Sequence, residues 1–354
     1  MARSRHNIQL LQGQRGGAAI LFVLCLPVLL GFAALAVDLA RLNLTRVELQ
    51  NAADAAALAG ARSLSEPSSA PSDQPYNWSA ATSTALDVAR RNFVNAVRIQ
   101  DALIETGYFN LQNPSLGLRY ASVPVTGDVP AVRVTVALSS TQNSGPLNLF
   151  FAPVFRLFNP DFIIEREVHA SAIAMITAPA AGTGLFPFVI SKKMLDHYWD
   201  LNTRTPILKN GVAPTLNIGS VYTFNGVQVL SGQWTTFQSS VKNPDVPFIM
   251  DLIANGNPTE LSIGMNTYIQ PGAKATLYSD VPVGKDVAVF IVDDVVTDSY
   301  QPIVAIAGFH VSGYNQGQKY IEGHFIDAAS IGTTNPGTGN GVPYGAYTPP
   351  ILVE

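Results

Sequence analysis

The hydrophobic positions in the first part of the chain follow one helical pattern that begins in an uncharged segment. No charged residue occurs from Gly16 to Val37. A helix of this length, rising about 1.5 Å per residue, just crosses a hydrocarbon core of about 30 Å. Beyond it, apolar positions continue at alternating spacings of four and three, which is the pattern of a heptad seam. The seam comprises Leu35, Leu39, Leu42, Arg46, Leu49, Ala53, Ala56 and Gly60. The pattern predicts one helix that spans a membrane and continues outside it as a packing stem.

The seam residues become smaller toward the end of the stem, where leucine gives way to alanine and glycine. Small side chains let a second backbone approach closely, so the surface from Ala53 to Ala61 suits a partner helix. The same face also suits packing on the protein's own sheet, and the sequence leaves both alternatives open. We predict that membrane and stem association involves Leu35, Leu39, Leu42, Leu49, Ala53, Ala56 and Gly60.

Shorter helix and strand signals follow the stem. A Ser- and Pro-rich segment from Ser65 to Trp78 ends the stem, and an amphipathic helix comes next. One side of that helix carries Ala85, Val88, Ala89, Phe93 and Val97. Residues 131–138 alternate as a half-buried strand does, residues 146–158 look helical at their centre, and residues 165–175 suggest a further strand. These signals predict a compact α+β head.

A β-rich domain is expected beyond a boundary of small residues. Residues 177–184 are typical of a linker, and turn signals such as Asn225-Gly226 and Pro271-Gly272 separate the short strands beyond it. A sandwich or barrel-like fold suits these strands. The α+β organisation that we predict comprises a cytoplasmic N-terminus (1–15), a transmembrane helix (16–37), a stem continuation (38–64), a pilin-like head (65–176), a linker (177–184), a β-rich domain (185–331) and a flexible tail (332–354).

Charge and cysteine content narrow the class of protein. The net charge is −4 and the basic residues form no stripe, which argues against nucleic acid as a partner. Arg3, Arg5 and Arg15 precede the apolar run, and this bias favours a cytoplasmic N-terminus. The single cysteine, Cys25, excludes an intramolecular disulfide.

Cleavage of the N-terminal segment is the alternative to a retained anchor. Ala34-Leu35-Ala36 has the form of a signal-peptide cleavage site. However, the apolar run exceeds the roughly 7–15 residues usual in signal peptides, and the heptad seam crosses the site without a break. Prepilin processing would require an acid near the start of the apolar run, and none occurs from Gln14 to Val37. We therefore expect the segment to be retained.

Four elements occur together in the N-terminal segment. They are Arg15-Gly16-Gly17, the apolar run with Pro27, Ala36-Val37-Asp38 and the alanine-rich stretch that begins at Leu49. Together they resemble the N-terminal segment of TadG/TadE-like proteins of the bacterial Tad (Flp) pilus assembly system. A weaker similarity continues in residues 137–155 and 165–176. The resemblance implies an inner-membrane or envelope protein that takes part in pilus assembly as a minor pilin-like subunit, with other pilus-assembly subunits as partners and no catalysis.

The remaining candidate residues do not form a recognisable catalytic or metal site. Some relatives carry a metal-binding Asp-x-Ser-x-Ser motif, but the acids in residues 291–299 have the wrong spacing. His197 is isolated, while His310 and His324 lie on separate predicted strands at a spacing that matches no metal motif. We expect no cofactor, no metal and no small-molecule substrate. The leading hypothesis is a membrane-anchored pilin-like component that acts by subunit association. The alternative is a membrane-tethered envelope enzyme or carbohydrate-binding module.

Overall fold

The computed structural model describes most of the chain. The described residues are 15–65, 76–120, 125, 127–156, 159–201, 203–238, 244–272, 275–326, 329–330, 334–336 and 344–353. They form two compact units, each assembled from segments far apart in the sequence. The first unit holds the chain up to Ala53, Arg90–Ala102 and Thr135–Ala170, and the second holds Asp54–Ala89, Leu103–Val134 and Ser171–Glu354.

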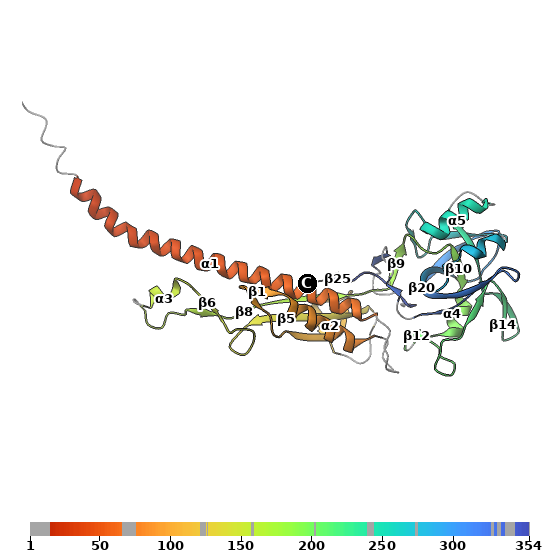
Figure 1. The fold of residues 1–354 in the computed structure, drawn as a ribbon, viewed down its shortest axis with the longest axis horizontal. Coiled ribbons are helices and arrows are strands. Elements are labelled where there is room, and N and C mark those ends of the chain that lie inside the picture. The colour runs from red at the N-terminus through yellow and green to blue at the C-terminus, as the bar shows by residue number, and fades with distance from the viewer. Residues whose placement is uncertain are drawn as a thin grey trace, which may run out of the picture. The chain divides into compact units, whose positions relative to one another are not determined.

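The predicted continuous stem helix is confirmed. Helix α1 runs from Arg15 to Ser63 without interruption and contains Pro27 (Figure 1). Among the described residues, its Ala19–Ser63 part is long and apolar enough to cross a membrane, and none of its most apolar stretch is buried. The other helices are α2 (Trp78–Arg91), α3 (Ala152–Phe155), α4 (Lys192–Tyr198) and α5 (Val246–Asn255), with 3-10 turns η1 (Pro114–Leu116) and η2 (Ala275–Asp280).

Helix α2 is shorter than the apolar pattern predicted. Its buried side consists of Ala81, Ala85 and Ala89. Asn95 and Ala96 have positive φ angles of 51° and 62°, so the chain turns there instead of continuing as a helix. The turn joins strands β1 (Phe93–Val94) and β2 (Val97–Arg98), and it leaves Phe93 and Val97 exposed.

A five-stranded sheet follows the order β25-β8-β5-β3-β4. The predicted strand at residues 131–138 is confirmed within β5, where Val132, Val134 and Val136 are fully buried. The strands are β3 (Leu103–Asn110), β4 (Leu118–Arg119), β5 (Asp128–Leu138), β8 (Val168–Met175) and β25 (Ile351–Leu352).

The expectation of a flexible tail is wrong for residues 344–353. Strand β25 pairs with β8, and Ile351 and Val353 pack against the apolar cluster of the sheet. The backbone N–H of Thr177 donates to the hydroxyl of Thr348 at 3.1 Å, and both residues are buried. The tail is ordered there because its apolar side chains gain burial and its backbone gains sheet hydrogen bonds. Residues 332–333, 337–343 and 354 of the predicted tail, and residues 1–14, lie outside the described part of the chain.

The segment predicted as a linker contains a strand. Strand β9 (Pro179–Gly182) pairs on its two sides with β17 (Leu261–Ser262) and β23 (Thr334–Pro336). The division of the chain into a head, a linker and a β-rich domain remains a prediction.

The β-rich part of the second unit contains a closed ring of strands. The sheet order is β13-β21-β20-β18-β16-β10-β19, and β19 also pairs with β20. Strand β20 is long enough to pair with β18 through residues 299–302 and with β19 through residues 303–310. This double pairing closes the ring, as the predicted barrel-like fold requires. The strands are β10 (Phe188–Ser191), β13 (Leu216–Ile218), β16 (Gly232–Phe237), β18 (Asn266–Ile269), β19 (Asp286–Val292), β20 (Ser299–Asn315) and β21 (Tyr320–Phe325).

Aromatic side chains fill the core next to this ring. Trp234 is fully buried, and its ring lies 5.2 Å from that of Phe188 and 5.6 Å from that of Tyr278. Trp199 is also buried, so both tryptophans contribute to cores.

Four short strand pairs complete the described structure. In one of them the predicted Asn225-Gly226 turn is confirmed, with positive φ at both residues. The pairs are β6 (Leu147–Asn148) with β7 (Glu165–Arg166), β11 (Trp199–Asp200) with β12 (Thr205–Pro206), β14 (Val221–Phe224) with β15 (Val227–Leu230), and β22 (Ala329–Ser330) with β24 (Ala346–Tyr347).

Candidate association surface on the stem helix

The predicted seam is buried in its C-terminal half and exposed near the apolar run. Leu49, Ala53 and Ala56 have 0% exposure, and Gly60 is also buried. In contrast, Leu35 and Leu39 are 55% and 54% exposed, and Leu42 is half-buried. The sequence left open whether the alanine-rich part of the stem packs on the protein's own fold or on a partner. In the structure it packs on the protein's own fold.

The buried face of α1 also contains two polar positions outside the seam. Asp38 and Thr45 are 4% and 0% exposed. They are seven residues apart, so they lie on nearly the same side of the helix. Next to the apolar run the seam is no longer covered, because Leu35 is 55% exposed there.

Gly60 explains why the end of the stem needs small residues. A Cβ atom at Gly60 would lie 2.9 Å from the Cβ of Ala85 and 3.0 Å from the backbone oxygen of Ala81. It would also lie 3.2 Å from Val132 of β5. The glycine therefore allows α1 to approach α2 closely, and the Ser63 hydroxyl donates to that of Thr84 at 3.1 Å beside this contact.

Asp38 is the polar group that fixes the other end of the stem. Its carboxylate accepts hydrogen bonds from the backbone N–H groups of Phe150 at 2.8 Å, Phe151 at 3.1 Å and Ala152 at 2.9 Å. A buried carboxylate is stable only when such donors satisfy it, and charge-assisted bonds of this type are stronger than neutral ones. Asp38 therefore ties the segment around α3 to the point where the uncharged run ends.

Further polar contacts lie on the same face of α1. The guanidinium carbon of Arg41 lies 3.8 Å from the centre of the Phe150 ring, a cation–π contact. Two turns along the helix, the carboxylate of Glu48 accepts a hydrogen bond from the backbone N–H of Asn95 at 2.8 Å. The Thr45 hydroxyl donates to the backbone oxygen of Arg41 at 2.9 Å. The residues that make these contacts lie outside the apolar seam, so the seam could not identify them. Asp38 could have been noticed in the sequence, because it is an acid directly after an uncharged run.

The opposite side of the stem remains exposed in this chain. Leu44 and Val47, outside the apolar run, are 57% and 56% exposed, and Leu39 is 54% exposed nearer the run. Leu44 and Val47 are three residues apart and therefore share one face of the helix. We call Leu39, Leu44 and Val47 the stem surface.

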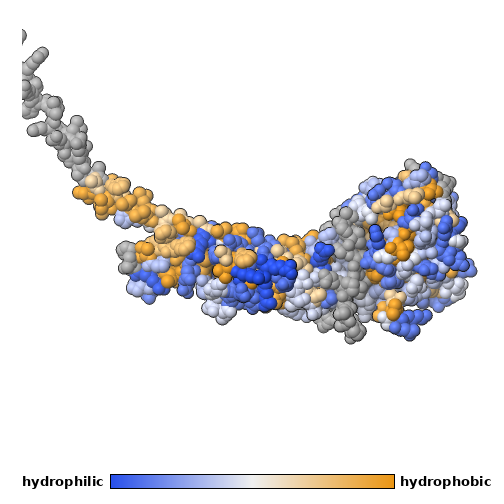
Figure 2. Space-filling view, viewed as in Figure 1, coloured by the Kyte–Doolittle hydropathy of each residue, from blue (hydrophilic) through white to orange (hydrophobic). Residues whose placement is uncertain are grey.

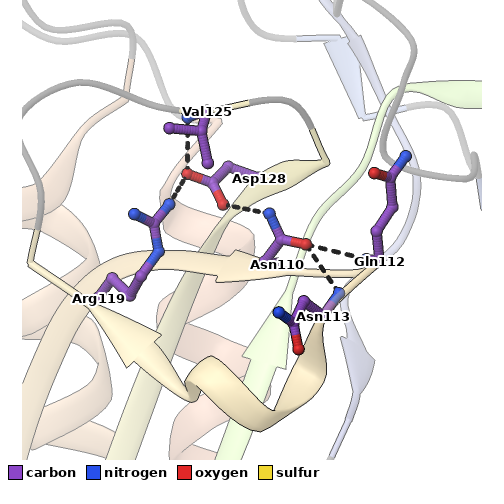
Figure 3. A network of polar contacts seen from close by, with 6 residues as sticks. All are labelled: Asn110, Gln112, Asn113, Arg119, Val125 and Asp128. Atoms are coloured by element: carbon purple, nitrogen blue, oxygen red, sulfur yellow. Dashed lines mark hydrogen bonds and ion pairs between the residues drawn. The ribbon is translucent and has the colours of Figure 1, made fainter.

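A partly buried ion pair orders the edge of the five-stranded sheet. Figure 3 shows Arg119 and Asn110 pointing toward the carboxylate of Asp128. The Asn110 side-chain amide donates to Asp128 at 2.9 Å, and the backbone N–H of Val125 donates to the same carboxylate at 2.9 Å. Because these partners satisfy the carboxylate, the cluster is a structural one.

A second polar cluster surrounds Tyr76, which belongs to the second unit. Burial raises the pKa of Tyr76 to about 12, although the nearby Arg204 guanidinium acts in the opposite direction. The guanidinium of Arg204 donates to the Tyr76 hydroxyl. Tyr76 therefore stays neutral at physiological pH.

The histidines singled out from the sequence have structural partners. The imidazole of His197 packs between Tyr198 and Phe224, at ring distances of 4.8 Å and 4.5 Å. His310 and His324 are register partners with rings 5.0 Å apart, and Nδ1 of His310 lies 2.6 Å from the Asp286 carboxylate. Within the described ranges, no group of three or more His, Cys, Asp or Glu side chains is placed to hold a metal ion.

A cavity of about 420 Å³ lies beside α5 in the second unit. Its lining includes Phe237, Phe248 and Asn257, with Asp251 as the single carboxylate among the lining residues. Paired carboxylates, the usual basis of glycoside hydrolysis, are therefore not part of this lining.

The described residues define an α+β fold in which one candidate membrane span continues directly into a packed stem. Residues 16–63 match the Tad family of Flp pilus-assembly TadE/G-like proteins, and residues 59–174 match the Tad_C family of Tad-like Flp pilus-assembly proteins. These matches place the N-terminal part of the chain in the TadG/TadE-like family, so the protein is related to Tad (Flp) pilus assembly. No curated protein and no solved structure matches the chain.

Proposed function

We propose that the protein is a membrane-anchored, pilin-like component of a Tad (Flp) pilus assembly apparatus that acts by subunit association and not by catalysis. Its apolar helix spans the bacterial inner membrane once, with the N-terminus in the cytoplasm. The folded units then lie in the periplasm or outside the cell. The partners are other pilus-assembly or pilin-like subunits.

The observation that carries this proposal is that three successive parts of α1 differ in burial. The stretch that begins at Ala19 is apolar and exposed, which suits lipid. Leu49, Ala53 and Ala56 are buried within the chain and hold the stem to its own fold. The stem surface is apolar and exposed between these two parts, so it remains available to a partner subunit.

In this proposal the seven predicted association residues have different roles. Leu35 belongs to the membrane segment and Leu39 to the stem surface, while Leu42 lies half-buried between faces. Leu49, Ala53, Ala56 and Gly60 maintain the internal packing on which the stem depends.

Fractionation of cells into sheared pili and membranes, followed by blotting for this chain, tests the proposal. A photo-crosslinking residue at Val47 should capture another pilus-assembly subunit. The matched control is a crosslinker at Val212, which is 68% exposed in the second unit. Recovery in the soluble fraction would contradict the membrane anchor. Normal pili in a strain that lacks the chain, with the chain still in the membrane fraction, would favour the tethered envelope enzyme or carbohydrate-binding module.

A further inference from the structure

An exposed apolar cluster surrounds α3 in the first unit. Phe150 is 65% exposed, Val154 is 52% exposed and Ile163 is 55% exposed. Phe151 and Phe162, at 41% and 37%, extend the same surface. Scattered exposed hydrophobic residues are normal, but five large ones within one short segment indicate an interaction site.

Internal contacts join these residues into one surface. The backbone N–H of Leu149 donates to the oxygen of Ile164 at 2.9 Å, which brings the two ends of the segment together. The rings of Phe155 and Phe162 lie 5.2 Å apart. Arg156 donates to the backbone oxygen of Phe162 at 3.1 Å. We call Phe150, Phe151, Val154, Phe162 and Ile163 the α3 surface.

The α3 surface is held at the end of the membrane-spanning segment. Asp38, whose carboxylate binds the N–H groups of Phe150, Phe151 and Ala152, is the first charged residue after the uncharged run. The uncharged run of residues 16–37 rises about 1.5 Å per residue and so just crosses a hydrocarbon core of about 30 Å. Asp38 therefore lies within about one turn of the boundary of that core. In Figure 2, hydrophobic residues gather over α1 and over the neighbouring α3 segment.

We propose that the α3 surface is a second membrane-contact element, which inserts into the boundary between lipid headgroups and acyl chains beside α1. This inference rests on the proposed membrane anchoring. Phenylalanine and aliphatic side chains flanked by arginine are typical of interfacial segments, which enter the boundary region by about 5–10 Å.

The charges around the surface fit this position. Arg41 lies over the Phe150 ring and Arg156 follows α3, so two cations can meet lipid phosphates. Asp161 and Glu165 are exposed, so their carboxylates keep access to water. Because both α1 and the α3 surface then contact the bilayer, the first unit is held in a fixed orientation instead of rotating about one helix.

Spin-label accessibility in lipid vesicles tests this inference on the full chain. The native cysteine is removed by Cys25→Ser, and single labels are placed by Val154→Cys or Ile163→Cys. Val28→Cys reports on the membrane span and Val212→Cys on water. All four positions are more than half exposed, so the label disturbs little packing. We expect labels at positions 154 and 163 to be accessible to oxygen and shielded from a water-soluble nickel relaxant, as at position 28.

The outcomes separate this inference from the proposed function. If position 28 is in lipid while 154 and 163 resemble 212, the anchor stands and the α3 surface does not enter the membrane. If 154 and 163 are immobilised and shielded from both relaxants, a protein partner covers them and the inference is wrong. If position 28 itself is accessible to nickel, both the anchoring and this inference fail.

Discussion

The carboxylate of Asp38 accepts a hydrogen bond from the backbone N–H of Ala152 at 2.9 Å, across 114 positions of sequence. The same carboxylate satisfies the N–H groups of Phe150 and Phe151. One side chain thus connects the end of the stem next to the uncharged run to the segment around α3. Substitutions at Asp38 should therefore loosen that segment in preference to the remainder of the fold.

Asp38→Asn should destabilise the first unit by about 1.5–3 kcal/mol, the usual value of hydrogen bonds to a charged group. The amide keeps the shape of the carboxylate but presents an N–H₂ group to backbone donors. Hydrogen exchange at Phe150 and Ala152 should accelerate, and the melting temperature in detergent should fall. Asp161→Asn, at an exposed carboxylate in the same unit, is the control. Equal effects of the two variants would contradict an anchoring role for Asp38.

Replacing two neighbouring alanines of the stem with leucine should have different effects on stability. Ala56 is fully buried and Ala55 is exposed. Ala56→Leu should cost about 1–3 kcal/mol because overpacking displaces neighbours, whereas Ala55→Leu should be nearly neutral. Thermal unfolding of the two variants provides the measurement. If Ala56→Leu leaves the melting temperature unchanged but abolishes partner binding, then Ala56 faces a partner and not its own fold.

The features predicted from the sequence were those governed by local patterns. The continuous helix α1, strand β5 and the Asn225-Gly226 turn depend on periodicity and turn chemistry within a few residues. These predictions needed no knowledge of which segments meet in space.

The features that the sequence did not reveal depend on contacts between distant segments. Whether Ala53 packs inside or faces a partner is decided by what lies against it, and the spacing of alanines is the same in either case. The tail looked irregular because β25 is two residues long and is defined by its partner strand β8. The role of Asp38 requires the amides of residues 150–152, which no pattern near Asp38 could identify.

Substitutions in the stem surface should weaken association without destabilising the fold. Leu44→Asn combined with Val47→Asn should change the stability by no more than about 0.5 kcal/mol per site, because both side chains are exposed. Co-purification of other pilus-assembly subunits should nevertheless decrease. Asn51→Ser, at an exposed polar position of the same helix, is the control. Unchanged co-purification in the double variant would exclude Leu44 and Val47 from the interface.

We expect substitutions at the two residues of the C-terminal strand β25 to differ in their effect. Ile351 packs against the cluster of the five-stranded sheet, while Leu352 is 40% exposed. Ile351→Asp should cost about 1–2 kcal/mol through the loss of its partial burial, and Leu352→Asp should cost less. Limited proteolysis should release the C-terminal residues from the first variant before the second. Similar cleavage rates in both would contradict the observed pairing of β25 with β8.

The lowered pKa of His324 makes the free energy of unfolding depend on pH. Burial lowers the pKa of His324 from its ordinary value of 6.5, the adjacent His310 lowers it further, and Asp286 acts in the opposite direction. Below pH 6.5 the unfolded chain therefore binds more protons at this residue than the folded chain, so stability rises with pH in this window. The contribution of His324 is complete above pH 6.5 and is lost as the pH falls through the lower folded-state pKa. Melting temperatures measured from about pH 8 to about pH 5 should fall more steeply in the native chain than in His324→Gln. His169→Gln, at an exposed histidine of β8, should keep the native slope, and a native slope in His324→Gln would exclude His324 as the responsible group.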